Sequence, residues 1–249
     1  MKKLLVRADD LGYSEGVNYG IAKSVKDGII GSVGVMTNMP AVAHGLKLLE
    51  GTAVCFGQHT NICIGKPLTD PALIPSITNE NGEFKSSKEY RQAKEDFVVL
   101  DEVILEIEAQ YKRFVELTGE QPHYFEGHAI VSANFFKGLE IVADKYGLKY
   151  SPFPLDGPSV KIRDKHVVMS MDATEPDYEP FASLKKLMEN ADDTGYYMFI
   201  CHPGYLDSYI LKNSSLTLPR PMEVEMACDP NTRKWIEDSD IELITYDDL

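Results

Sequence analysis

The sequence has 249 residues, of which 43% are hydrophobic and 26% are charged, a composition typical of a globular protein with a well-filled core. A chain of this length can form one large domain, and we expect a single domain over residues 1–249. Its net charge of −14 argues against binding to nucleic acid or to anionic membranes, because both would repel it.

The cysteines and the amino-terminal segment bear on the cellular compartment. None of the four cysteines (Cys55, Cys63, Cys201 and Cys228) forms a CxxC pair, which favours reduced structural thiols over a disulfide framework. Acidic residues follow the start MKKLLVRA before the apolar stretch of a signal peptide could form, and no apolar run reaches the length of a membrane span. We therefore expect a cytoplasmic protein.

Short apolar runs alternate with amphipathic stretches along the chain. Residues 3–8 (KLLVRA) predict a buried strand, and Ser14 can cap a following helix that ends near Gly28. Residues 64–88 are rich in Pro, Asn, Gly and Ser, and a loop of that length is often functional. The expected strands are 3–8, 32–37, 53–58, one beginning at 123, 148–151, 166–171, 196–201 and 241–245. The expected helices are 15–27, 41–49, 88–118, 134–146, 181–190, 222–227 and 232–238.

This alternation predicts an α/β fold with a mainly parallel sheet covered by helices. Seven or eight such units suit a TIM-barrel-like (β/α) barrel better than an open sheet. In α/β barrels the active site lies at the carboxyl ends of the strands. Polar side chains that can act as ligands or acids follow four of the expected strands: Asp9, Asp10, His59, Asn61, Glu126, His128 and His202.

The adjacent carboxylates Asp9 and Asp10 allow two interpretations. At a strand end both can reach one site, where one binds a metal ion and the other accepts a proton from water. Alternatively they cap the next helix, and the pair alone does not decide between the two. For His59 and His128 taken singly, a hydrogen-bonded structural histidine is the better interpretation. Together with a carboxylate they form a plausible facial ligand set with open positions.

His202 is followed by Pro203 and Gly204, which turn the chain and project the imidazole from the strand end. The imidazole can protonate a leaving group, or it can cap the turn. Arg220 can bind a substrate, or it can form a structural ion pair with Glu223 or Asp207.

Five segments resemble the YdjC-like family of carbohydrate deacetylases. RADDLGYSEGVNYGI (7–21) is similar to the family's opening motif, and GSVGVMTNMPAVAHGLKL (31–48) to its next block. GQHTNICIGKPL (57–68) and PHYFEGH (122–128) resemble its two histidine segments. CHPGYLDSYI (201–210), followed by LPRPMEVE (218–225), resembles its carboxyl-terminal signature. The segments occur in order over nearly the whole chain.

The resemblance implies a TIM-barrel-like deacetylase fold and one divalent metal ion, magnesium in the usual description of the family, although two imidazoles also suit zinc. It implies Asp10, His59 and His128 as metal ligands, Asp9 as the general base and His202 as the acid. The expected reaction is hydrolysis of the N-acetyl group of an amino sugar or a (phosphorylated) chitooligosaccharide. Substrate contacts are expected from Arg220, Asn61 and Tyr205, and a homodimer is a reasonable default.

The chain departs from the family at its second histidine segment. The family commonly has an Asp two residues before a histidine-rich run, whereas here Glu126 precedes His128 and Ala129, Ile130, Val131 and Ser132 follow. The ligand position is kept, but neighbouring polar contacts are lost. Two alternatives stay open: a phospho-disaccharide hydrolase of the cellobiose-phosphate type, and a non-catalytic sugar-binding protein on the same barrel.

Overall fold

The computed structural model describes residues 1–155 and 157–249. Its strands are β1 (Lys2–Leu11), β2 (Ser32–Val35), β3 (Cys55–Thr60), β4 (Tyr124–Gly127), β5 (Lys149–Tyr150), β6 (Ser159–Ile162), β7 (Lys165–Ser170), β8 (Tyr196–Cys201) and β9 (Ile241–Ile244). Its α-helices are α1 (Glu15–Lys26), α2 (Val42–Leu48), α3 (Ser87–Gln92), α4 (Leu100–Thr118), α5 (Ala133–Tyr146), α6 (Pro180–Glu189), α7 (Ser208–Asn213), α8 (Pro219–Cys228) and α9 (Pro230–Asp238). Two short 3₁₀ helices, Pro71–Leu73 and Tyr246–Asp248, complete the elements.

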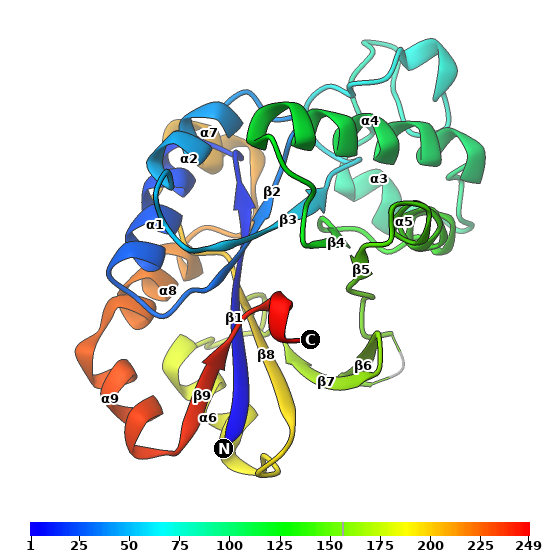
Figure 1. Cartoon of the computed structure of the whole chain (residues 1–249). Coiled ribbons are helices and arrows are strands. Elements are labelled where there is room, and N and C mark those ends of the chain that lie inside the picture. Colours follow the sequence, from blue (N-terminus) through cyan, green and yellow to red (C-terminus); the bar gives the residue numbers. More distant parts are fainter. Residues whose placement is uncertain (156) are drawn as a thin grey trace.

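The strands form one nine-stranded sheet that curves into a nearly closed barrel with helices on its outside (Figure 1). The hydrogen-bonded order is β5-β4-β3-β2-β1-β8-β7-β6, and β9 pairs with β1. In the described chain every named pair is parallel except the β6–β7 hairpin. The sequence-based prediction of a mainly parallel α/β barrel is therefore confirmed.

β1 is the central strand because three strands pair with it. β8 pairs with Lys3–Ala8 along one edge. β9 pairs with the first half of β1 and β2 with its second half, so these two strands share the other edge in succession. β1 therefore has hydrogen-bonded neighbours on both edges. These neighbours fix the position of its carboxyl end and so the directions of the Asp9 and Asp10 side chains.

The two-residue period of the strands sorts side chains between the barrel interior and the outer layer. In β1, Leu4, Val6 and Ala8 pack outward in the cluster that contains α1 and α2, whereas Leu5 lies in an interior cluster with Tyr124 and Tyr246. β8 alternates in the same way, with Met198 and Ile200 inside and Tyr197, Phe199 and Cys201 outside. Arg7 and Asp9 continue the inward series of Leu5, so the strand carries buried charge towards its carboxyl end.

The expected helix over 88–118 is wrong in one respect, because the structure contains two helices there. Ser86 caps the start of α3 through a capping box with Glu89, and the helix stops before Ala93, whose backbone is extended (φ −66°, ψ 135°). α4 begins only at Leu100. Phe97 and Val98 therefore lie in the connection between the two helices, and the helical period of apolar residues belongs to α4 alone.

Two elements were not anticipated from the sequence, namely strand β6 and helix α7. Both are short, and the alternation of polar and apolar residues in β6 (SVKI) extends over only four residues. α7 depends on its cap, since the carboxylate of Asp207 accepts hydrogen bonds from the backbone N–H groups of Tyr209 and Ile210. The other expected strands and helices are present with ends shifted by a few residues.

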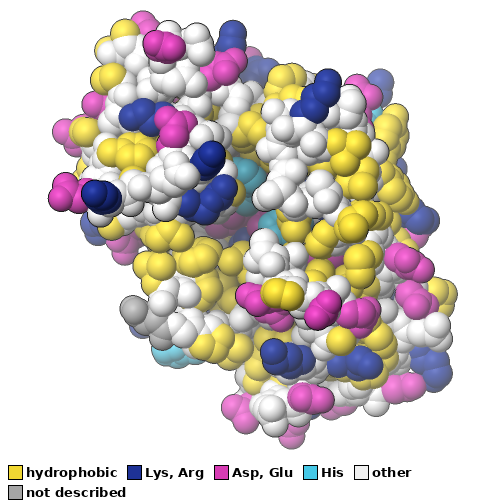
Figure 2. Space-filling view, turned by 180° about the vertical axis from the view of Figure 1, so that it is seen from behind, with side chains coloured by type: hydrophobic (Ala, Val, Ile, Leu, Met, Phe, Trp, Pro, Cys, Tyr) yellow, Lys and Arg dark blue, Asp and Glu magenta, His cyan; other side chains and the backbone are white. Residues whose placement is uncertain are grey.

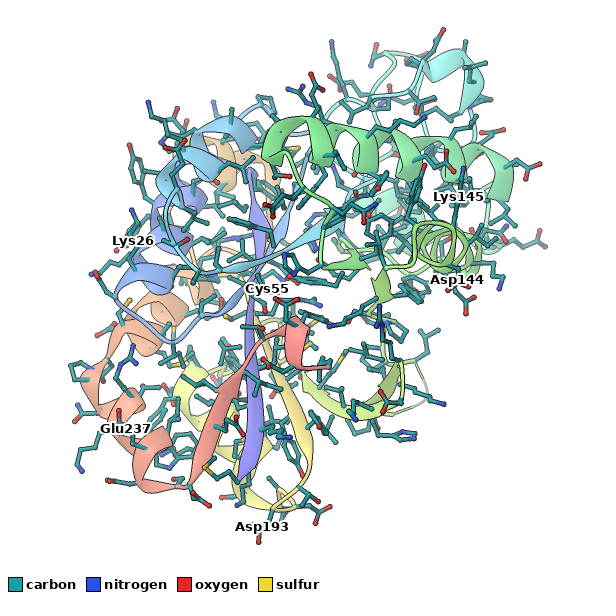
Figure 3. The ribbon with its side chains drawn as sticks, in the orientation of Figure 1. Lys26, Cys55, Asp144, Lys145, Asp193 and Glu237 are labelled. Carbon is teal, nitrogen blue, oxygen red and sulfur yellow. The ribbon has the colours of Figure 1, made fainter. Side chains whose placement is uncertain are left out.

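Charged residues lie mainly on the outer faces of the helices. Figure 3 labels Lys26 on α1, Asp144 and Lys145 on α5 and Glu237 on α9, all pointing away from the barrel, and Cys55 within it. All four cysteines are free, and Cys228 alone among them is not buried. None of the helices in the described residues is long and apolar enough to cross a membrane.

Candidate metal and active site

Asp9 and Asp10 both reach the interior because β1 is irregular at its end. The register between β1 and β2 shifts between Ala8 and Leu11, and Asp10 has a positive φ of 79°. Asp is among the few non-glycine residues that adopt this left-handed conformation readily. The local twist places two consecutive carboxylates on one side of the strand, where a regular strand would separate them. Asp9 and Asp10 do not cap the next helix, because the side chain of Ser14 caps α1.

Asp10, His59 and His128 converge from three strand ends. The Nε2 atom of His59 lies 3.1 Å from Oδ1 of Asp10 and 2.9 Å from Nδ1 of His128, and the latter atom is 3.0 Å from the same Asp10 oxygen. All three residues are buried. They form a group of side chains that could hold a metal ion.

Glu126 determines which nitrogen of His59 faces this group. His59 Nδ1 lies 2.5 Å from Oε1 of Glu126. Burial would raise the pKa of Glu126, but His59 and Arg7 outweigh it and lower that pKa, so the ionised carboxylate accepts a hydrogen bond from the Nδ1–H group. In neutral His59 the Nε2 lone pair then points towards Asp10 and His128. Such an outer hydrogen bond is typical of metal-binding histidines.

The three converging groups therefore favour a cation between them. Burial alone would lower the pKa of His128, but Asp10 raises it to about 9. Burial would raise the pKa of Asp10, yet Arg220 and His128 hold it well below its ordinary value. A carboxylate with two imidazoles is a donor set that suits zinc and other divalent transition metals. The residues present thus fit a divalent cation held by Asp10, His59 and His128.

Arg7 holds Asp9 by a two-point ion pair. Its Nε and Nη2 atoms each donate to a different carboxylate oxygen of Asp9, both at 2.7 Å. Nη1 donates to the hydroxyl of Tyr246 at 2.8 Å, and Nη2 lies 3.6 Å from Glu126. Both partners are almost fully buried. Asp9 is consequently fixed in orientation, with its remaining lone pairs available to the cavity.

Arg220 pairs with Asp10 and with neither Glu223 nor Asp207, which corrects the structural partners suggested by the sequence. Its Nη2 atom donates to Oδ2 of Asp10 at 2.7 Å, and the guanidinium is 1% exposed. Nη1 and Nε donate to the backbone oxygens of His202 and Leu216. Arg220 thus leaves Oδ1 of Asp10 free for the metal group and connects this ligand to the His202 turn.

His202 follows β8 and lines the same cavity. Its backbone N–H donates to Oε2 of Glu223 at 2.6 Å, and the other Glu223 oxygen accepts from the hydroxyl of Tyr178. Burial raises the pKa of Glu223 to about 7 and lowers the pKa of His202 to about 4. In the described structure Nδ1 of His202 is buried without a hydrogen-bond partner, so this atom is free to meet a bound molecule.

These groups open into one cavity of about 340 Å³. Figure 2 shows the corresponding hollow, with histidine side chains visible at its base and hydrophobic side chains at its border. Seven residues that the sequence analysis named as candidates line this cavity: Asp9, Asp10, His59, Glu126, His128, His202 and Arg220. Arg7, Tyr13 and an apolar wall also line it and were not chosen as site residues from the sequence. Arg7 could have been found, because the strand period places it on the same face as Asp9.

Asn61 and Tyr205 are not among the residues that line this cavity. The Asn61 side chain is fully buried, where it accepts hydrogen bonds from the backbone N–H groups of Cys63 and Ile64 and donates to Asn38 and to the Ile64 oxygen. It therefore shapes the loop after β3. Tyr205 is 40% exposed, and its backbone N–H donates to the oxygen of Gly16. The structure does not bring either residue to the expected substrate contact.

The substitution Glu126→Gln should weaken metal binding about 10- to 100-fold, because a neutral amide accepts a weaker hydrogen bond from His59 and lowers its basicity as a ligand. Competition with a chromophoric zinc chelator measures the affinity. Glu106→Gln is the matched control, since Glu106 is a fully buried carboxylate on α4 whose partners are Gln110 and the backbone of residues 68–69. Equal affinities for both variants and the unsubstituted protein would contradict the proposed orienting contact.

The chain is similar to known proteins over its whole length. The chain is 31% identical over 255 residues to carbohydrate deacetylase 2 of Listeria innocua serovar 6a, which covers 99% of this chain and 98% of the relative. It is 30% identical to the chitooligosaccharide deacetylase of Serratia marcescens, covering 100% of this chain and 99% of the relative. The crystal structure of an Enterococcus faecalis V583 protein named for cellobiose-phosphate cleavage superposes with a TM-score of 0.84 at 22% identity, covering 99% and 98% of the two chains. The family model described as YdjC-like protein matches residues 3–238, and the chain belongs to this YdjC-like family.

Proposed function

We propose that the protein is a metal-dependent carbohydrate deacetylase that hydrolyses the N-acetyl group of an amino sugar or of a chitooligosaccharide, free or phosphorylated. The observation that carries the proposal is the convergence of Asp10, His59 and His128 beside a second, separately held carboxylate, Asp9, in one cavity. The names of the relatives from Listeria innocua and Serratia marcescens support the substrate class.

Asp10, His59 and His128 are proposed to hold the divalent cation, magnesium or zinc. When bound, the cation supplies Lewis acidity, which polarises the acetyl carbonyl and makes water in the cavity more acidic. Arg220 keeps Asp10 ionised and oriented, and Glu126 orients His59 so that its Nε2 atom faces Asp10 and His128. These two contacts pre-arrange the ligands before the cation arrives.

Asp9 is proposed as the general base. Arg7 binds both of its oxygens from one side, so the carboxylate cannot rotate and its other lone pairs face the cavity. It removes a proton from water as the water oxygen attacks the acetyl carbon. Fixed orientation matters here because proton transfer requires the acceptor within hydrogen-bond reach.

His202 is proposed as the general acid. It comes from the strand next to β1, lines the same cavity and has an unpartnered Nδ1. His202 is neutral because burial lowers its pKa to about 4, so it receives the proton that Asp9 has removed from the water and passes it to the leaving nitrogen as the carbon–nitrogen bond breaks. The products are acetate and the free amino sugar. Glu223 holds the His202 backbone and thereby positions the ring.

Cleavage of a glycosidic bond fits these residues less well. That reaction generally needs two opposed carboxyl groups, one of which donates a proton to the leaving oxygen. Of the other interior carboxylates, Glu126 is engaged by His59 and Asp10 by Arg220 and the metal group, so neither is available to oppose Asp9. Similarity at 22% identity to the Enterococcus faecalis protein supports the fold alone.

Acetate release tests the reaction directly. Protein freed of metal by a chelator should release no acetate from N-acetylglucosamine or N,N′-diacetylchitobiose (with 6-phosphorylated forms included), and added Zn²⁺ or Mg²⁺ should restore the activity. His59→Ala and His128→Ala should abolish it, because each loses one of the cation's nitrogen donors. The exposed His166→Ala is the matched control. Metal-independent release of acetate, or release of free sugar units without acetate, would rule the proposal out.

Replacing the proposed base or acid should reduce turnover but not metal binding. Asp9→Asn and His202→Gln should each lower kcat roughly 100- to 10,000-fold, since each removes a proton transfer. Their zinc affinity should stay within a few-fold of the unsubstituted protein, which separates these roles from that of a ligand. Full turnover by either variant would remove that residue from the mechanism.

A further inference from the structure

We propose that Phe153 is a stacking platform for the second sugar ring of the substrate, so that the enzyme binds a disaccharide unit better than a monosaccharide. This inference rests on the proposed deacetylase function and names the part of the site that binds the sugar next to the reacting one.

One face of the Phe153 ring is held by Phe136. The two rings are stacked, with centroids 5.9 Å apart and planes inclined by 8°, and Phe136 belongs to α5, which packs on β4. Phe153 is nevertheless 37% exposed. Because nearly parallel rings at this distance are offset, Phe136 contacts only part of one face of Phe153 and leaves ring surface accessible. Both rings line the cavity that contains the metal ligands.

An apolar wall continues from this ring towards the metal group. Ile130, Val131, Pro152 and Pro154 line the same cavity, and Val131 is 58% exposed. The family resemblance leads one to expect histidines just after His128, so an apolar border here is a property of this chain. A pyranose ring presents C–H groups on its faces and hydroxyls around its edge. An aromatic face in a cavity with polar groups binds such a ring, and Asn213, Ser214 and Ser215 are among the polar residues that line this cavity.

The size of the cavity favours one enclosed sugar with a second sugar at the border. Its volume of about 340 Å³ lies near the lower limit of ligand sites, which span roughly 300–1,000 Å³. A sugar whose N-acetyl group reaches Asp10, His59 and His128 occupies most of that space. The adjoining ring of an oligosaccharide must then lie at the border, where hydrophobic side chains form part of the rim of the hollow (Figure 2) and where Phe153 is exposed.

Sugar binding by metal-free protein tests the platform without turnover. Isothermal titration with N-acetylglucosamine and with N,N′-diacetylchitobiose should give tighter binding of the disaccharide. Phe153→Ala should weaken binding of the disaccharide about five- to tenfold and leave the monosaccharide within about twofold. Phe153→Tyr should retain the preference. Leu155→Ala is the matched control, because Leu155 is 60% exposed in the same segment but does not line the cavity.

Unchanged disaccharide binding by Phe153→Ala would overturn the inference, as would an equal loss for both sugars or a loss shared by Leu155→Ala. A change in the oligomeric state of Phe153→Ala, with sugar binding intact, would assign the ring to a contact between chains and would also overturn it. The selective loss in binding, combined with no acetate release by metal-loaded protein, would uphold the platform and reject the deacetylase function.

Discussion

The site depends on the neutralisation of carboxylates that the barrel buries at the carboxyl ends of its strands. Asp9, Asp10 and Glu126 are each at most 2% exposed, and the guanidiniums in contact with them are Arg7 and Arg220. Three buried negative charges thus face two fixed positive ones. Because isolated buried charge is strongly unfavourable, the remaining negative charge requires a cation or a protonated imidazole. A cation meets this requirement best at Asp10, whose carboxylate lies between His59, His128 and Arg220.

The packing of the barrel leaves room for this group of charges at one end. Below it, the stacked rings of Tyr124 and Tyr246, with centroids 3.6 Å apart, fill the interior. At the level of the charged side chains, Gly34 on β2 leaves space because it has no side chain. A Cβ atom there would lie 2.8 Å from Oε1 of Glu126 and 3.2 Å from Oδ1 of Asp9. The lower interior is therefore filled by side chains, and the cavity described above begins where the acids and imidazoles meet.

Much of this arrangement could be predicted from local sequence. The alternation of apolar runs and helices indicated the parallel barrel, and the polar residues after the strands indicated one rim. The partner of Arg220 could not be predicted, because Asp10 lies 210 positions away and nearer acids were available. Asn61 follows His59 closely and suggested a site residue, but at the end of the strand its side chain turns into the loop. The break between α3 and α4 was hidden because Phe97 and Val98 continue the apolar period of α4.

X-ray absorption spectroscopy of protein loaded with one equivalent of Zn²⁺ or Co²⁺ tests the central claim most directly. The spectrum should show scattering from two imidazole rings together with oxygen neighbours, as Asp10, His59 and His128 require. The same measurement on His59→Ala should show a single imidazole, and on the exposed His166→Ala it should be unchanged. A coordination shell of oxygen alone in the unsubstituted protein, or one that keeps two imidazoles in His59→Ala, would contradict the account.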